Sequence, residues 1–230
     1  MKPFYQDKYV TIFNADCRDI LPSLEPVDLV LTDPPYGIDI AKTGKVGGEN
    51  KAQVKQYIAS DWDKDRLSID VINLIRSKSV NQIIFGGNYI ADLLPASPCW
   101  IVWDKDNTGN FADCELAWTS FKTATRKYLW RWNGMLQEAG NPKEVRHHPT
   151  QKPEGLFSAI IAGYSKDTDL ILDPFFGSGT TGYCSKKLQR RCIGIEIEEK
   201  YCEVAARRCQ QEVMELVIPT QYTDKQQELL

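Results

Sequence analysis

The sequence predicts an α/β fold in which helices cover both faces of a mostly parallel central sheet. Segments of strand and helix character alternate between residues 153 and 216, and this alternation is typical of βαβ units. Two short apolar segments, 27–35 and 169–174, run directly into turns rich in proline or glycine, as buried strands do. The length of 230 residues suits a single domain, 1–230, with a moderate insertion.

In the N-terminal part, strands are predicted where short apolar runs end at polar residues, glycine or proline. These strands span 9–13, 27–35, 81–90, 99–104, 115–120 and 127–132, with the last two as candidates for antiparallel pairing. The segment from about 38 to 66 is polar and contains glycine, so a mobile loop is expected there. A second loop is expected at 104–113.

In the C-terminal third, the boundaries of helices and strands are clearer. A helix is predicted over 153–165, with Pro153 in its first turn, and a strand follows at 169–174. A glycine-rich turn at 176–182 then leads into a helix that ends near Gln189. The next strand is 191–197, and the helix after it spans 198–216. The polar residues beyond 216 are expected to form a frayed tail.

Composition narrows the class of protein. The first ten residues lack the apolar run of a signal peptide, and no stretch approaches the roughly 20 apolar residues of a membrane span. We therefore expect a soluble, cytoplasmic protein. The seven cysteines include no CxxC pair and the only two histidines are adjacent, so neither a metal site nor a disulfide framework is expected. Most cysteines should be small core residues.

The glycine-rich turn, DPFFGSGTTG at 173–182, indicates a ligand site at the end of a strand. Gly177, Gly179 and Gly182 allow close approach of the backbone to a ligand, and Asp173 offers an acceptor for a ligand ammonium. Glu196 ends the next strand, at the spacing expected for a carboxylate that binds both ribose hydroxyls. A phosphate-binding loop is disfavoured because no lysine follows Gly179.

The turn TDPPYG at 32–37 presents two acceptors and an aromatic ring. Pro34 and Pro35 stiffen the turn, and the Pro34 carbonyl then points outward beside the Asp33 carboxylate. An exocyclic base nitrogen is a poor nucleophile because its lone pair is delocalised into the ring. Two acceptors on its hydrogens favour a localised lone pair that can attack a methyl group held in line. Tyr36 is expected to stack on a base extruded from the duplex.

Three linked motifs in this order carry a family resemblance. TDPPYG (32–37), HPTQKP (148–153) and DPFFGSGTT (173–181) together resemble the amino-type DNA methyltransferases that act on adenine N6 or cytosine N4. The catalytic motif precedes the cofactor motif, which resembles the circularly permuted beta class. The resemblance implies a Rossmann-like fold that binds S-adenosylmethionine, and the aspartate in the catalytic motif favours adenine.

The resemblance also implies roles for individual residues. Asp33, Pro34, Pro35 and Tyr36 would hold the target base. Glu196 would hold the ribose of the cofactor, while Asp16 would lie near its adenine. The remaining cofactor residues are implied to surround the methionine part or to line the pocket from the other side: His148, Thr150, Lys152, Asp173, Phe175, Gly177, Ser178, Gly179 and Thr180.

Target recognition in this family lies between the two motifs, here approximately 104–147. The overall net charge is −3, but residues 121–152 hold seven basic residues against two acidic ones. The candidates for phosphate contacts are Lys122, Arg126, Lys127, Arg131, Lys143 and Arg146. Tyr128, Trp130 and Trp132 interleave with them, and at least half of these aromatics are expected to be core residues. The loop at 38–66 is a candidate to close over the flipped base.

Several alternatives stay open from the sequence. Methylation of cytosine N4 uses the same chemistry, whereas RNA and protein-glutamine methyltransferases normally place the cofactor motif first. A non-catalytic DNA-binding module would not need Asp33, Glu196 and the glycine turn together, and it would fail to bind S-adenosylmethionine. A nucleotide hydrolase lacks its phosphate-loop lysine. The expected substrate is double-stranded DNA, bound by a monomer or homodimer, with a cognate restriction endonuclease as a candidate partner.

Overall fold

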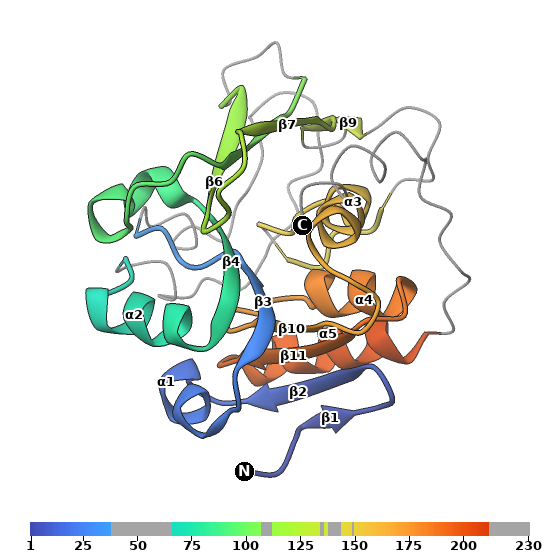
Figure 1. The fold of residues 1–230 in the computed structure, drawn as a ribbon. Coiled ribbons are helices and arrows are strands. Elements are labelled where there is room, and N and C mark those ends of the chain that lie inside the picture. Colours follow the sequence, from blue (N-terminus) through green and yellow to red (C-terminus); the bar gives the residue numbers. More distant parts are fainter. Residues whose placement is uncertain (38–65, 107–111, 134–135, 138–143, 149, 212–230) are drawn as a thin grey trace.

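The computed structural model describes residues 1–37, 66–106, 112–133, 136–137, 144–148 and 150–211. Within these residues the fold is built on a nine-stranded sheet in the order β1-β2-β11-β10-β3-β4-β6-β5-β7 (Figure 1). Its strands are β1 (Tyr5–Gln6), β2 (Val10–Asn14), β3 (Val27–Thr32), β4 (Ser79–Phe85), β5 (Trp100–Asp104), β6 (Cys114–Thr119), β7 (Arg126–Leu129), β10 (Leu170–Asp173) and β11 (Arg191–Glu196). A separate two-stranded sheet pairs β8 (Trp132–Asn133) with β9 (Leu136–Gln137).

The centre of the sheet is parallel, as the sequence predicted. Strands β2, β11, β10, β3 and β4 all run in one direction. From β3 the chain crosses to β4 on one side, whereas from β10 it crosses to β11 on the other side. The point between β3 and β10 is therefore the topological switch point, where open α/β sheets bind their ligands at the carboxyl ends of the strands.

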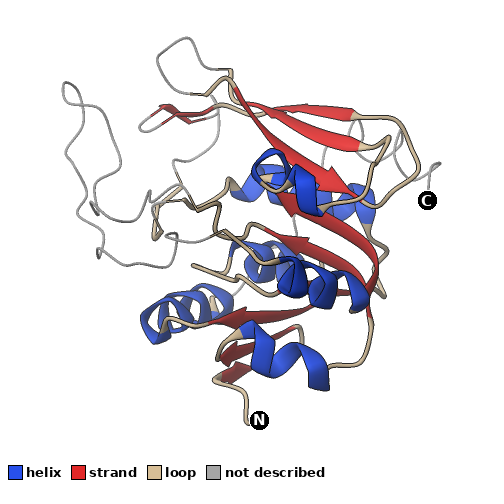
Figure 2. Cartoon of the chain, turned by 90° about the vertical axis from the view of Figure 1, so that its left-hand side faces the viewer, coloured by secondary structure: helices blue, strands red, loops and turns tan. Residues whose placement is uncertain are grey.

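Helices cover both faces of the sheet. The longer helices α3 (Glu154–Tyr164), α4 (Thr180–Lys187) and α5 (Glu199–Gln210) pack against one face, while α1 (Cys17–Ile20) and α2 (Ile69–Ser77) cover the other (Figures 1 and 2). Strand β3 alternates between them: Leu29 and Leu31 pack with the α3–α5 side, and Val30 packs with the α1–α2 side. A strand buried on both faces reads as a continuous apolar run, which is why the sequence reveals it so clearly.

The antiparallel part extends the sheet beyond β4. Strand β6 pairs antiparallel with both β4 and β5, as expected for this region, but β7 pairs parallel with β5. Short 3₁₀ helices occupy η1 (Leu21–Ser23), η2 (Gly87–Tyr89) and η3 (Ala91–Leu93). The sequence predicted no element over residues 69–77, where α2 begins after its N-cap Ser68. The periodicity of α2 is short, so it gives only a weak local signal.

The C-terminal elements lie close to their predicted positions. Helix α3 starts one residue after Pro153, which serves as its N-cap, and α4 and β11 follow in the expected order. The expected helix over 198–216 is described as far as α5 reaches, and residues 212–230 lie outside the described part. The expected loop at 38–66 likewise lies almost wholly outside it. Among the described helices, none is long and apolar enough to cross a membrane.

Six of the seven cysteines are buried, and Cys114 is the exposed one. Four of them (Cys184, Cys192, Cys202 and Cys209) belong to the core between the sheet and helices α3–α5. Their burial agrees with the prediction that most act as small core residues.

Candidate functional site

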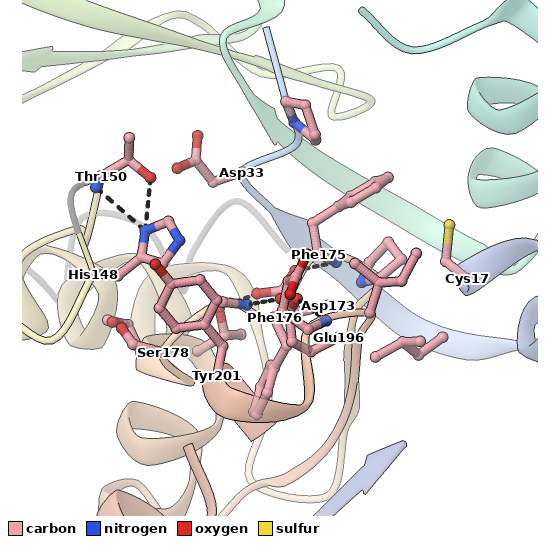
Figure 3. Close-up of a pocket in the computed structure, with 18 of the residues that line it drawn as sticks. Cys17, Asp33, His148, Thr150, Asp173, Phe175, Phe176, Ser178, Glu196 and Tyr201 are labelled. Atoms are coloured by element: carbon pink, nitrogen blue, oxygen red, sulfur yellow. Dashed lines mark hydrogen bonds between the residues drawn. The ribbon is translucent and has the colours of Figure 1, made fainter. Parts of the chain in front are cut away.

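A cavity of about 260 Å³ opens at the edge of the sheet where β3, β10 and β11 end. In Figure 3, Asp33 lies above Asp173 and Glu196, with His148 and Thr150 to the left. Most of the predicted catalytic and cofactor residues line this one cavity: Asp16, Asp33, Pro35, His148, Thr150, Lys152, Asp173, Phe175, Gly177, Ser178, Thr180 and Glu196. The structure thus brings the three sequence motifs together, although they lie up to 140 residues apart.

A buried hydrogen bond joins the ends of the two motif strands. Thr32 Oγ1, at the end of β3, donates to Asp173 Oδ1, at the end of β10, over 2.7 Å. Thr181 Oγ1 donates to the other carboxylate oxygen over 2.6 Å, and the Phe175 amide also donates to Oδ1. Burial raises the pKa of Asp173 to about 6, while these donors oppose the rise. Asp173 therefore joins the TDPPYG turn to the glycine-rich turn, with one acceptor site left for a ligand.

Glu196 is held by backbone donors on both oxygens. The Gly177 amide donates to Oε2 over 2.7 Å and the Glu198 amide donates to Oε1 over 2.8 Å. Burial raises the pKa of Glu196 to about 7, because the two amides compensate only part of the desolvation. Each oxygen keeps a lone pair free, so the side chain can accept a hydrogen bond from each of two neighbouring ligand hydroxyls.

Gly177 and Gly179 of the glycine-rich turn have different surroundings. Gly177 has φ +51°, and a Cβ built there would come no nearer than 4.0 Å to His148, so it would enter the cavity. Gly179 has φ +78° and does not line the cavity. A Cβ there would lie 2.7 Å from the Cβ of Ala205 in α5. The sequence predicted that Gly179 faces the ligand. In the structure this glycine instead allows the turn to pack closely against α5.

The HPTQKP segment closes the cavity from the side of α3. The Thr150 amide donates to His148 Nδ1 over 3.2 Å, and the His148 ring makes an edge contact with Tyr201 at 4.3 Å. Ser178 Oγ donates to Gln151 Oε1 over 3.3 Å, which ties this segment to the glycine-rich turn. Burial lowers the pKa of His148 to about 3, so its imidazole is neutral at physiological pH.

Asp33 is engaged on both carboxylate oxygens. The Tyr36 hydroxyl donates to Oδ1 and the Lys152 ammonium donates to Oδ2. Burial raises the pKa of the Asp33 carboxyl, and the Lys152 cation opposes that rise. The Tyr36 ring stacks on Tyr89 with the centroids 4.8 Å apart, and this packing requires Gly86, where a Cβ would meet the ring at 2.0 Å.

Asp16 lies at the cavity rim beside the start of α1. Its carboxylate caps that helix by accepting from the Arg18 amide and also pairs with the Arg18 guanidinium. The residues lining the cavity include five carboxylates but only one lysine: Asp16, Asp33, Asp173, Glu196 and Glu198 against Lys152. This balance disfavours a polyphosphate and favours a ligand that carries positive charge.

Comparison with known proteins assigns the family. A model of N6- and N4-methyltransferases, described as DNA methylase, matches residues 104–207. The type II methyltransferase M.HinfI of Haemophilus influenzae is 30% identical over 256 residues, covering 90% of the chain and 70% of M.HinfI. The chain belongs to the DNA methylase family. The type II methyltransferase M2.LlaDCHI of Lactococcus lactis subsp. cremoris is 28% identical to this methylase, covering 90% of the chain and 91% of its own length.

A solved structure agrees with this assignment. The M1.HpyAVI–SAM complex superposes with a TM-score of 0.57 at 26% identity, covering 86% of the methylase and 99% of that chain. Both the family and the Rossmann-like fold expected from the three motifs are thus confirmed.

The predicted DNA contacts of the methylase fall at two edges of the sheet. Strand β7 runs parallel to β5, so it begins at the edge opposite the cavity and ends at the cavity edge. Arg126 begins this strand and Lys122 precedes it, which places both at the opposite edge. Arg131 follows the strand at the cavity edge, where it pairs with Asp106. Residue spacing gave no strand direction, so sequence alone could not separate these cations.

The other predicted contacts have partners of their own. Lys127 Nζ lies 3.2 Å from the Asp104 carboxylate, and the Arg146 guanidinium lies 4.6 Å from the Trp132 ring centre. Lys143 lies outside the described residues.

The aromatic side chains of this region belong to the core. Tyr128 and Trp132 are buried, and Trp130 packs on Gly155 in the first turn of α3. This agrees with the expectation that at least half of them are core residues: two of the three are buried, and Trp130 is partly buried against the core.

Two positioning side chains of the methylase escaped the sequence analysis. Arg208 is buried on α5 and donates to the Ser178 carbonyl over 2.7 Å and to Glu154 over 2.9 Å, so it holds the glycine-rich turn against α3. Arginine side chains are mostly exposed, so its residue type gave no signal of this role. Thr32 could have been suspected, because a polar residue at the end of an apolar strand needs a partner.

Proposed function

We propose that this methylase transfers the methyl group of S-adenosylmethionine to the exocyclic N6 of an adenine that has been flipped out of double-stranded DNA. The observation that carries the proposal is the shared cavity. It has the Asp33 carboxylate on one side and the Glu196 and Gly177 turn on the other, with the bond from Thr32 to Asp173 between their strands. This arrangement supports a reaction in which a donor and an acceptor are held face to face.

The cavity suits S-adenosylmethionine in charge and in shape. The cofactor carries a sulfonium and an ammonium, and the five lining carboxylates favour that net positive charge. We propose that Glu196 binds both ribose hydroxyls, that Asp173 attracts the ammonium and that Gly177 leaves room for the methionine part. We also propose that Phe175 lies beside the methionine part and that Asp16 lies near the adenine of the cofactor. When bound, the cofactor supplies an electrophilic methyl group.

The target amino group would be held by the catalytic turn. We propose that Asp33 accepts one amino hydrogen and the Pro34 carbonyl accepts the other, which localises the lone pair of the nitrogen. These two acceptors would hold the nitrogen in line with the methyl group, which would pass from sulfur to nitrogen when the cofactor is bound. The nitrogen must afterwards lose one proton, and Asp33 is the nearest acceptor in the proposal. Pro35 stiffens the turn, and Tyr36 contributes both its ring and its hydroxyl.

Adenine is favoured over cytosine by the aspartate at position 33. A carboxylate accepts hydrogen bonds without donating, so Asp33 can accept from an amino group without a competing donor. The resemblance to the family links this aspartate form with adenine. Cytosine N4 presents the same amino chemistry and is retained as the alternative outcome of the experiment below.

DNA would approach the cavity edge of the sheet. We propose that residues 104–147 form the recognition region and that Arg131 and Arg146 supply phosphate contacts there. Lys127 lies within β7, which leads to this edge. Lys122 and Arg126 lie at the opposite edge of the sheet, so we do not propose them as phosphate contacts. We further propose that the enzyme acts in the cytoplasm, as a monomer or homodimer, alongside a cognate restriction endonuclease. The names of its relatives as type II methyltransferases support that setting.

One experiment tests the base, the atom and the target sequence together. The methylase is expressed in a host that lacks DNA methylation, and the DNA is sequenced with detection of modified bases. The expected result is N6-methyladenine within one short sequence. N4-methylcytosine would replace the adenine proposal, and unmodified DNA would refute both. Asp33→Ala serves as the matched variant: it should abolish the modification while S-adenosylmethionine still binds, as measured by calorimetry.

A further inference from the structure

An alternating row of charges, with Lys152 buried and the other three partly buried, leads from the predicted recognition region to the Asp33 carboxylate. It begins at Lys105, just after β5, and passes through Glu115 on β6 to Lys152 and Asp33. Lys105 Nζ lies 2.6 Å from Glu115 Oε1, and Lys152 Nζ lies 3.3 Å from Glu115 Oε2. Lys152 also contacts the Asp33 carboxylate directly, and its side chain is only 7% exposed. Two cations and two anions thus alternate, and none of their side chains is more than 24% exposed.

Buried ion pairs contribute little net stability, because desolvation consumes most of their mutual attraction. Four such groups in a row therefore call for a reason other than stability. The row ends on the group that would receive the substrate, with Lys152 on one oxygen of Asp33 and the Tyr36 hydroxyl on the other. A carboxylate offers about four acceptor sites, so donors already on both oxygens can fix its orientation and still leave room for a base amino group.

We propose that Lys152 is a positioning residue for Asp33 and that Glu115 and Lys105 brace it from the recognition region. This inference rests on the proposed methyl transfer and adds three residues to it. It also revises the part that the sequence suggested for Lys152. The residue lines the cavity, but its ammonium is directed to the catalytic carboxylate, with the rings of Tyr36 and Phe85 at 5.8 and 5.5 Å.

The position of Glu115 makes this brace unusual. It belongs to the stretch where DNA contacts were expected, and its carboxylate lies between two lysines. Because β6 forms part of the recognition region, a shift of this strand would move Glu115 and with it the cation on Asp33. The geometry therefore links the region that reads the DNA to the group that holds the target base.

The charge on Asp33 offers a direct readout. Burial raises the pKa of Asp33, and Lys152 lowers it, while Glu115 raises it. The other polar groups facing this set are the Tyr36 hydroxyl on the same turn, His148 before Lys152 and Asp173 at the end of β10. Removing the cation should therefore raise the pKa of Asp33, and removing the anion Glu115 should lower it.

The experiment measures the ionisation of Asp33 by carbon-13 NMR of its carboxyl group, assigned by its loss in Asp33→Asn, in protein without cofactor. Lys152→Met should raise the Asp33 pKa by about 1–3 units, the usual effect of losing a close opposite charge. Glu115→Gln should shift it downward. In methylation assays the acid limb of the pH profile of kcat should follow the same two directions, with kcat reduced in both variants. The affinity for S-adenosylmethionine should not fall in either variant.

Lys186→Met is the matched control. Lys186 pairs with Asp7 over 2.6 Å, and the two side chains are 19% and 23% exposed, against 7% and 19% for Lys152 and Asp33. This control should lower stability without moving the Asp33 pKa. Lys152→Arg keeps the positive charge and should retain the wild-type pKa, so it tests the proposal if Lys152→Met does not fold.

An unchanged Asp33 pKa in Lys152→Met would overturn the proposal, as would a loss of cofactor affinity without any shift. The NMR measurement needs no turnover. A failure of methyl transfer in the wild-type protein would therefore refute the proposed function without being confused with a failure of this inference.

Discussion

Replacing Thr32 with valine removes the bond that fixes the two motif strands side by side. Valine has nearly the same shape as threonine, but it leaves Asp173 Oδ1 without the donor at 2.7 Å. Both side chains are buried, so water cannot replace the lost hydroxyl. A hydrogen bond to a charged group contributes about 1.5–3 kcal/mol, and that is the expected loss in the free energy of unfolding.

The melting temperature should fall by about 3–12 °C, because each kcal/mol corresponds to roughly 2–4 °C in a chain of this length. The loss should also depend on pH. The folded pKa of Asp173, about 6, exceeds its ordinary value of 3.8, so the charged carboxylate opposes folding and stability falls as the pH rises through about 6. Thr32→Val removes a donor to that charged form. Its effect should therefore be full above pH 6 and should shrink below it.

Thr119→Val provides the matched control. Thr119 is fully buried, and its hydroxyl donates to the Cys99 carbonyl over the same 2.7 Å, but that acceptor is neutral. Its loss should cost only about 0.5–1.5 kcal/mol, without the dependence on pH, and should leave methyl transfer intact. Thermal unfolding followed by circular dichroism between pH 5 and 8 measures both variants. Equal losses in the two variants at every pH would refute the role assigned to the pairing of Thr32 with Asp173.

Three further predictions concern the ligands. Because a protonated Glu196 loses acceptor sites, affinity for S-adenosylmethionine should fall by up to about tenfold per pH unit below 7. Glu196→Gln should bind the cofactor weakly, and its affinity, measured by calorimetry, should not depend on pH in this range. Gly177→Ala should place a methyl group in the cavity and weaken binding, and its φ of +51° adds a strain of roughly 1–2 kcal/mol. Gly194→Ala, whose Cβ would meet the Phe176 ring at 2.4 Å, should cost roughly 1–3 kcal/mol of stability at a position that does not line the cavity. Arg131→Ala should weaken DNA binding and lower its salt slope by about 1, while Lys122→Ala should not; equal effects would contradict the assignment of edges.

The sequence alone determined the elements and the chemistry at their ends. Strands such as β3 and β10 are short apolar runs that stop at aspartate and proline, and these signals are local. The turns that follow require particular residue types, so TDPPYG and DPFFGSGTT each indicate their chemistry from the local sequence alone. The weak elements, such as α2, were missed because short helices depend on packing more than on pattern.

Only the tertiary structure decided which of these ends meet. Strand order is set by crossovers and burial, and no local pattern states that β3 lies beside β10 or that β7 runs parallel to β5. The same holds for charges: Lys152 and Glu115 each look like an ordinary polar residue in the sequence. Their pairing exists because β6, antiparallel to β4, begins at the cavity edge, so Glu115 lies there between Lys105 and the Lys152 that contacts Asp33.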